Sequence, residues 1–292
     1  MNSMTYDFAV IGGDLRQVYM AEDLSSRGFS VLLYGLENLC SKANMEHAKS
    51  LAQAIDSSKV ILTPIPFTKN GIHILSVDAK ADLTPEILCT HLKKGHMLYG
   101  GCFTKNIREF CEASDIYYND FMEEEEITLF NTIATAEGTI AEAIIGSDGN
   151  LHGSSCLILG YGRCAKTLAE KLKVLCGQLT IAARSPLAIA QAKTSSFNAV
   201  SLPALTDVIS EYDYIFNTIP APVLGRELLE KTKQDVTIID IASAPGGVDF
   251  TAAKELSRNA RLCLGLPGKY SPKASAAFLT KYLLSSLGEK AV

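Results

Sequence analysis

Residues 155–185 read SCLILGYGRCAKTLAEKLKVLCGQLTIAARS, and this stretch decides the fold. Its apolar run Cys156–Leu159 ends at Gly160, as a buried parallel strand does when it enters a tight turn. Leucines then recur at the spacing of a helix with one apolar face, and Gly177 is placed to end that helix as a left-handed cap. The stretch therefore predicts a strand, a glycine turn, a helix and a second strand.

The small residues of this stretch suit the binding of a dinucleotide. Gly160 permits the turn, Gly162 lets a pyrophosphate approach the backbone, and Ala165 lets the helix pack close to the strand. The N-terminus of the helix offers free N–H groups and a positive dipole end to the phosphates. We therefore predict a Rossmann nucleotide-binding domain, the alternative being a purely structural turn.

The end of the second strand indicates which cofactor is bound. An acid at this point would accept a hydrogen bond from the ribose 2'-hydroxyl of NAD, but the chain has Arg184 and Ser185 there. Because a 2'-phosphate would lie beside them, we expect NADP. The alternative interpretation is that Arg184 is a solvated surface arginine.

Composition excludes several classes of function. The chain has 292 residues, 47% of them hydrophobic, which is enough for two cored domains. A formal net charge of -5 offers no basic face for nucleic acid. We expect neither a signal peptide nor a membrane span, and hence a cytoplasmic protein. The eight cysteines form no C-x-x-C pair, which argues against zinc and disulfides.

The N-terminal half shows its own alternation of strands and helices. Strands are predicted at 6–11, 30–34, 59–62, 97–99 and 115–118. We expect an α/β fold of two Rossmann-like, doubly wound domains that close on an interdomain cleft, similar to two-domain dehydrogenases. The N-terminal domain would cover 1–146, and the NADP-binding domain 147–273. The helix 274–292 would pack back on the N-terminal domain.

Two further strands of the second domain, near Tyr214 and Val236, end in polar turns rich in Pro or Gly. Ligands of open α/β sheets bind outside the carboxyl ends of such strands, although these turns are also common in proteins that bind nothing there. The cofactor site is therefore predicted to contain Gly160, Tyr161, Gly162, Arg163, Arg184, Ser185, Asn217, Thr218, Ile219, Asp240, Ala242 and Gly265.

Several segments outside the fingerprint are characteristic, and those that contain Arg16, Glu137-Gly138 and Pro245-Gly246-Gly247 are more specific than the fingerprint itself. They are Gly12-Gly13-Asp14-Leu15-Arg16-Gln17, Glu137-Gly138-Thr139-Ile140, His152-Gly153-Ser154, Asn217-Thr218-Ile219-Pro220, Pro245-Gly246-Gly247 and Gly265-Leu266-Pro267-Gly268. Together these segments resemble those of the A subunits of bacterial dipicolinate synthases, over nearly the whole chain. Cys164-Ala165 departs from the family, which tends to have Thr-Gly there.

The resemblance implies an NADP-dependent oxidoreductase acting on CH-CH groups in the mother-cell cytoplasm of a sporulating bacterium. It would oxidise dihydrodipicolinate, which derives from hydroxytetrahydrodipicolinate of lysine biosynthesis, to dipicolinate. A flavoprotein-like B subunit would be its partner. The sequence leaves open whether the chain also forms a homo-oligomer. The substrate residues would be Arg16, Asn131, Thr135, Lys269 and Lys273, with Glu137 as a base. Thr135 and Glu137 equally suit a helix cap and a first-turn acid.

Two other functions fit the sequence. Leu62–Lys69 faintly resembles the substrate loop of shikimate dehydrogenases, in which a Thr, a Pro and a Lys follow a strand, but the spacing differs. The second alternative is a non-catalytic subunit that binds NADP and docks a partner on which the redox chemistry takes place.

Overall fold

The computed structural model describes residues 5–39, 45–78 and 80–289. It divides the chain into two compact units, one made of Met1–Thr128 with Ser271–Val292, the other of Leu129–Tyr270. The first division lies inside helix α5 (Glu125–Gly146), and so comes earlier than residue 146, where the sequence suggested it. The reason is that α5 is one continuous helix of 22 residues, of which the apolar run Ile140–Ile145 forms only the last part.

The first unit is built on a six-stranded parallel sheet. Its strands are β1 (Tyr6–Ile11), β2 (Val31–Tyr34), β3 (Glu46–His47), β4 (Ser58–Leu62), β5 (Met97–Gly100) and β6 (Tyr117–Asp120). They follow the order β3-β2-β1-β4-β5-β6. The direction of winding therefore reverses between β1 and β4, which is where doubly wound sheets bind ligands.

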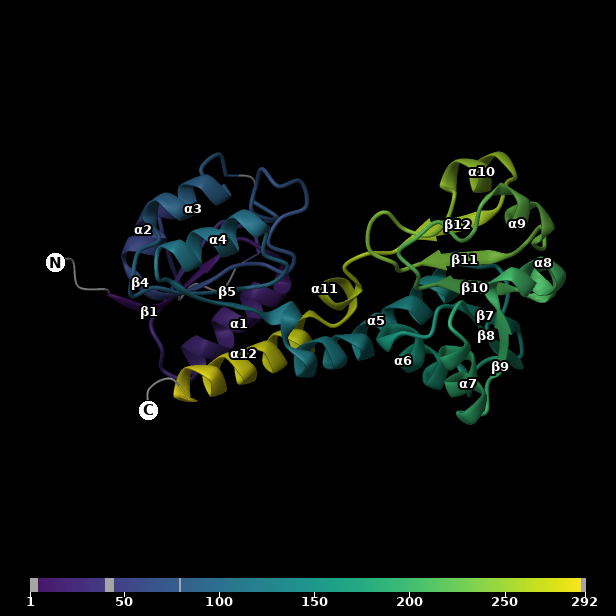
Figure 1. Cartoon of the computed structure of the whole chain (residues 1–292). Coiled ribbons are helices and arrows are strands. Elements are labelled where there is room, and N and C mark those ends of the chain that lie inside the picture. Colours follow the sequence, from purple (N-terminus) through teal and green to yellow (C-terminus); the bar gives the residue numbers. More distant parts are fainter. Residues whose placement is uncertain (1–4, 40–44, 79, 290–292) are drawn as a thin grey trace. The chain divides into compact units, whose positions relative to one another are not determined.

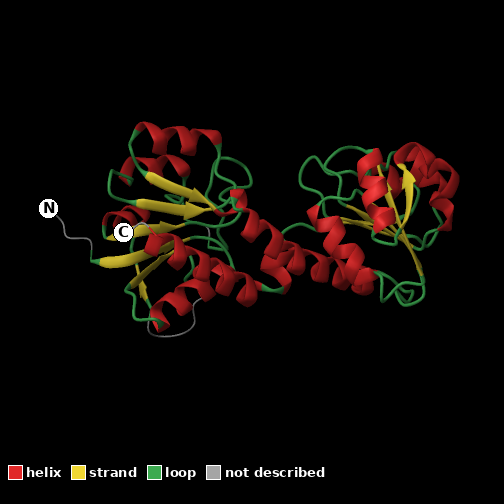
Figure 2. Ribbon diagram, turned by 60° about the horizontal axis from the view of Figure 1, so that its bottom comes forward, coloured by secondary structure: helices red, strands yellow, loops and turns green. Residues whose placement is uncertain are grey.

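Helices cover both faces of this sheet (Figures 1 and 2). One face carries α1 (Leu15–Ser26) and α12 (Pro272–Glu289), and the other α2 (Leu51–Asp56), α3 (Pro85–His91) and α4 (Lys105–Ala113). Asp14 begins α1 with a reciprocal capping box, because its side chain accepts from the helix backbone while Gln17 accepts from the Asp14 N–H. Leu279 and Leu283 of α12 are buried in the same core as α1.

The second unit repeats the design. Its strands are β7 (Ser155–Leu159), β8 (Gln178–Ala183), β9 (Asn198–Ser201), β10 (Tyr214–Asn217), β11 (Thr237–Asp240) and β12 (Asn259–Leu262), all parallel, in the order β12-β11-β10-β7-β8-β9. Helices α5, α6 (Arg163–Leu172), α7 (Pro186–Thr194) and α11 (Leu266–Tyr270) cover one face, and α8 (Leu205–Val208), α9 (Arg226–Lys231) and α10 (Phe250–Glu255) the other. Short 3-10 turns cover Phe121–Glu123, Leu202–Ala204 and Ile209–Glu211.

The predicted class, α/β with two doubly wound parallel sheets, is confirmed. The edge strands β3 and β9 were missed, since each is short and mostly polar. The prediction for Gly177 was wrong. Helix α6 ends at Leu172, and a Cβ on Gly177 would lie 2.5 Å from the Gly153 carbonyl oxygen, so this glycine permits a close backbone approach. No helix among the described residues is long and apolar enough to cross a membrane.

Gly138 lets two helices of the second unit approach each other closely. It is buried in α5, and a Cβ at this position would lie 2.9 Å from Leu266 Cβ and 2.9 Å from Tyr270 Cδ2, both in α11. Carbon atoms normally approach to about 3.5–4.0 Å. The glycine in the middle of α5 is therefore required by the contact with α11.

We expect Gly138→Val to lower the free energy of unfolding by about 1–3 kcal/mol, because the side chain forces α11 away from α5. Urea denaturation of the full chain measures this change. Gly288→Val is the control, since that glycine lies in α12, where an added Cβ would meet nothing within 4 Å. Equal stability of the two variants would contradict the close contact.

Candidate functional site

The glycine turn between β7 and α6 has the geometry of a dinucleotide site. Gly160 has φ +99°, and a Cβ there would lie 2.4 Å from Thr218 Oγ1. Thr218 Oγ1 in turn donates to the Leu159 carbonyl at 2.8 Å, which fixes the end of β10 beside the end of β7. Only glycine fits this conformation and this space.

Gly162 is the N-cap of α6. Because glycine has no side chain, it makes no capping hydrogen bond to the first N–H groups of the helix. A Cβ on Gly162 would meet no heavy atom within 4 Å, so open space lies beside this residue at the start of α6. Ala165 is fully buried and holds the helix close to the sheet. An uncapped N-terminus with open space beside it fits a pyrophosphate, whose charge would be met by free N–H groups.

The neighbouring side chains of the turn are aromatic and basic. The ring of Tyr161 is half-buried and lies edge-on to Phe197, with 6.4 Å between centroids. Lys166 Nζ lies 5.3 Å from the centroid of the Tyr161 ring. Arg163 is exposed at the first position of α6. These groups put positive charge beside the glycine turn.

Arg184 and Ser185 follow β8 and are both exposed. Ser185 is the N-cap of α7, but its hydroxyl makes no cap hydrogen bond. Arg184, Ser185 and the start of α7 therefore follow one another directly after the carboxyl end of β8. All three favour an anion there.

Asn217 and Asp240 are fully buried at the ends of β10 and β11. Asp240 accepts from Asn217 Nδ2 at 2.8 Å and from the Ala242 and Gly247 N–H groups, both at 2.9 Å. Asn217 also donates to the Ile219 carbonyl and accepts from its N–H, each at 3.1 Å. These two side chains are thus committed inside the protein, and their role is to shape the loops at the carboxyl edge.

Ion pairs occupy two of the predicted catalytic groups. Lys171 Nζ lies 2.9 Å from Glu137 Oε1. Lys269 forms an ion pair with Glu142, a residue that the sequence analysis missed. The hydrogen bond from Lys269 is the main cause that lowers the pKa of Glu142, against the effect of burial. One signal in the sequence could have identified Glu142. It is an acid within the apolar run Ile140–Ile145, one helical turn after Gly138.

Arg16 is almost completely buried at the end of β1. It binds Asp14 with both ends of the fork, at 3.0 Å and 2.8 Å, and also donates to the Ile65 carbonyl. Burial would raise the pKa of Asp14, but the hydrogen bonds and charge of Arg16 outweigh it and lower that pKa. The Arg16 charge is therefore largely neutralised within its own unit.

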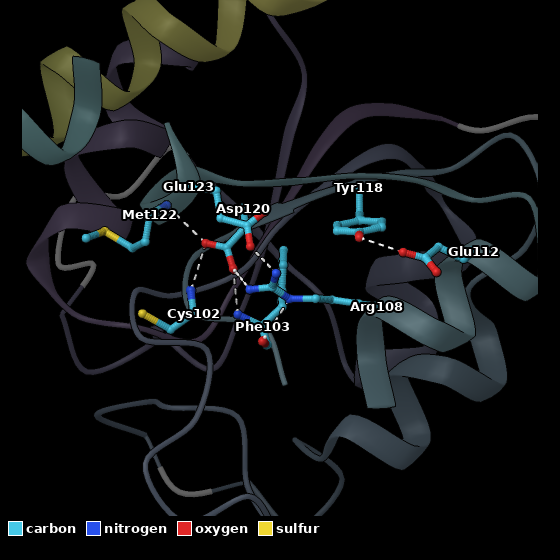
Figure 3. Close-up of polar contacts among 8 residues, drawn as sticks. All are labelled: Cys102, Phe103, Arg108, Glu112, Tyr118, Asp120, Met122 and Glu123. Carbon is cyan, nitrogen blue, oxygen red and sulfur yellow. Dashed lines mark hydrogen bonds and ion pairs between the residues drawn. The ribbon is translucent and has the colours of Figure 1, made fainter. Parts of the chain in front are cut away.

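Asp120 organises the other side of this edge (Figure 3). Its side chain is 1% exposed and accepts from the Cys102 and Phe103 N–H groups at 2.9 Å, from the Met122 N–H at 3.0 Å, and from Arg108 Nη2 at 2.9 Å. Cys102 has φ +60°, and its side chain is exposed. The sequence analysis missed Asp120, because an acid that ends a strand does not reveal its partners.

The first sheet has the topology of a nucleotide site but fills the crevice with its own chain. The Gly13 N–H donates to the Leu75 carbonyl at 2.8 Å, and the Val77 N–H donates to the Gly13 carbonyl at 3.1 Å. A Cβ on Gly12 would lie 2.6 Å from the Leu75 oxygen, and one on Gly35 would lie 3.3 Å from Leu83. The ends of β1 and β2 thus lie against residues 74–77 and Leu83, in the place where a doubly wound sheet would bind a dinucleotide.

The predicted substrate residues come from both units. Arg16 and Lys273 belong to the first, and Asn131, Thr135, Glu137 and Lys269 to the second, so a site that joins them stays a prediction. Thr135 Oγ1 donates to the Asn131 carbonyl within α5 at 2.8 Å.

Two further residues of the predicted cofactor site lie in the second unit. Ala242 is buried, and Gly265, with φ +68°, leads into α11. No cluster of three or more His, Cys, Asp or Glu in the described ranges could hold a metal.

Comparison with known proteins agrees with the resemblance seen in the sequence motifs. Residues 7–122 match the family described as the N-terminal domain of the dipicolinate synthase A subunit. The chain is 28% identical to the A subunit of dipicolinate synthase of Bacillus subtilis (strain 168) over 295 residues, which cover 96% of this chain and 95% of the relative. The resemblance stated from the motifs is thereby confirmed.

Solved structures show the same fold. The crystal structure of the dipicolinate synthase A subunit from Bacillus halodurans superposes with a TM-score of 0.85 at 27% identity, covering 98% of this chain and 99% of that one. An L-alanine dehydrogenase superposes with a TM-score of 0.60 at 14% identity over 96% of this chain and 91% of that one, which shows the fold alone. The two-domain arrangement of Rossmann-like sheets is thus one that dehydrogenases use.

Asp240→Asn should lower the free energy of unfolding by about 2–3 kcal/mol, because an amide NH₂ would face buried N–H donors that now have an acceptor. The change is measured by urea denaturation. Asp235→Asn, at an exposed position just before β11, is the control and should change the free energy little. A loss that is no larger for Asp240→Asn than for the control would show that the carboxylate does not hold the loops.

Proposed function

We propose, from the resemblance of nearly the whole chain to the A subunit of dipicolinate synthase, that this protein is the NADP-binding subunit of such an enzyme. It oxidises dihydrodipicolinate to dipicolinate in the mother-cell cytoplasm of a sporulating bacterium. The observation that carries the proposal is the glycine turn after β7, where the start of α6 has no side-chain cap. The chain that contains this turn matches the A subunit of Bacillus subtilis over 96% of its length.

The cofactor residues are those at the carboxyl edge of the second sheet. The backbone of Gly160–Arg163 faces the pyrophosphate, and Arg184 with Ser185 meets the 2'-phosphate. The loops that Asp240 holds are next to the nicotinamide half. NADP, when bound there, supplies the hydride acceptor.

The substrate chemistry asks little of the protein beyond binding and orientation. Loss of a hydride and a proton from a dihydropyridine gives an aromatic ring, which favours the reaction. The chain has to hold two carboxylates and exclude competing orientations. Glu137 takes the proton in this proposal, which requires its carboxylate to leave the ion pair with Lys171.

The Bacillus subtilis relative is named as one subunit of its enzyme, so we propose a partner for this chain as well. That partner is the flavoprotein-like B subunit, and the substrate derives from the hydroxytetrahydrodipicolinate of lysine biosynthesis. The second unit exposes several aliphatic side chains that such a partner could cover, namely Ile144, Ile145, Leu262 and Leu264.

Arg184→Ala should weaken NADP binding about 10-fold to 150-fold, because one charged phosphate contact is lost, and should leave NAD binding nearly unchanged. Arg184→Asp should reverse the preference by repelling the phosphate and accepting from the 2'-hydroxyl. Calorimetric titration of both nucleotides measures the two affinities. Lys193→Ala removes an equal charge from the end of α7 and is the control. Equal losses for NADP and NAD would show that Arg184 does not bind the phosphate.

The chain alone, incubated with NADP⁺ and freshly generated dihydrodipicolinate, should give little dipicolinate above the spontaneous rate. Adding the B subunit should produce turnover, since this chain is proposed to be one part of the enzyme. The ultraviolet band of the pyridine product is the readout. Robust turnover by the single chain would overturn the partnership, and no turnover by the pair would overturn the reaction.

A further inference from the structure

A hydrogen-bonded turn between Thr68 and Ile74, after β4, carries the exposed residue Lys69. Thr68 pairs with Ile74 across a short antiparallel bridge. Inside the turn the Gly71 N–H donates to Thr68 Oγ1 at 2.9 Å. The N–H groups of Ile72 and His73 both donate to Asn70 Oδ1, each at 3.0 Å. Hydrogen bonds on both sides of Lys69 therefore close the turn, while Lys69 itself is exposed.

The backbone contacts bring this turn to the carboxyl edge of the first sheet. The Phe67 N–H donates to the Gly101 carbonyl at 2.7 Å, just beyond the end of β5. On the other side of the turn, Ser76 bridges to Gly13, the residue before Asp14. Lys69 thus lies between the segments that end β1 and β5. Its charge is also one of the causes that lower the pKa of Asp14.

Lys69 differs from the arginines of this edge because, within the described residues, it forms no ion pair, although its charge acts on Asp14 from a distance. Arg16 is neutralised by Asp14. Arg108 is shared between Asp120 and Glu123. The ammonium of Lys69 pairs with no carboxylate in the described part of the chain.

A dianionic ligand is attracted by uncompensated charge. An arginine that already binds an aspartate with both ends of its fork forms, with that aspartate, a nearly neutral pair, and a new anion would have to compete for its donors. A lysine ammonium without a counter-ion offers a full charge and three donors on a flexible stem. Of the cations named here, Lys69 is therefore the one available to a carboxylate.

We propose that Lys69 is the cationic group of the first unit that binds a carboxylate of the dicarboxylate substrate, while Arg16, clamped by Asp14 and the Ile65 carbonyl, fixes the turn beside it. The proposal rests on the proposed function, since it takes a pyridine dicarboxylate as the ligand. It requires no residue outside the first unit.

The test is calorimetric titration of pyridine-2,6-dicarboxylate into the full chain saturated with NADP. Lys69→Gln should weaken binding of the dicarboxylate about 10-fold to 100-fold, because a charge-assisted contact is lost. Lys69→Arg keeps the charge and should bind within about 3-fold of the wild type. Raising the salt concentration should weaken the wild type more than Lys69→Gln.

Lys59→Gln is the matched control, since Lys59 is an exposed lysine on β4 with no ion pair to a described residue. It should leave binding of the dicarboxylate unchanged, and all three variants should bind NADP like the wild type. Equal dicarboxylate affinity of Lys69→Gln and the wild type overturns the inference alone. Failure of the wild type to bind the dicarboxylate overturns the proposed function with it.

Discussion

One kind of interaction holds the working edge of each sheet together: a buried carboxylate that accepts backbone N–H groups from the loops around it. Asp120 does this in the first unit and Asp240 in the second. Loop N–H groups at the end of a parallel sheet have no strand partner, and a buried N–H without an acceptor is costly. The two aspartates meet that requirement and thereby determine where the loops lie.

The nucleotide half of the site could be predicted because its determinants are local. Gly160, Gly162 and Ala165 lie within six consecutive residues. The structure requires Gly160 for its positive φ and its close contact with Thr218, and it buries Ala165 completely, as the motif implies. Most strands of the two sheets could also be predicted, because apolar runs alternate with glycine turns along the sequence. Short polar strands such as Glu46–His47 gave no such pattern and were missed.

The polar partners could not be predicted in the same way. The Arg16 side chain was recognised as notable, but the sequence does not say that Asp14 and the Ile65 carbonyl already occupy it. Glu142 and Lys269 are far apart in the chain and meet only because Gly138 lets α11 approach α5. Such pairings depend on tertiary contacts, about which local patterns carry no information.

The position of α12 has a consequence for the order in which the chain can fold. The first unit buries Ala276, Leu279 and Leu283 of this last helix against its sheet and α1, yet the whole second unit lies between them in the sequence. During synthesis, Leu129–Tyr270 emerges as one uninterrupted segment and can complete its core at once. The first unit emerges earlier but still lacks one wall of its core. Until α12 has been synthesised and has left the ribosome, the apolar side of α1 lacks the helix that covers it and stays exposed to solvent.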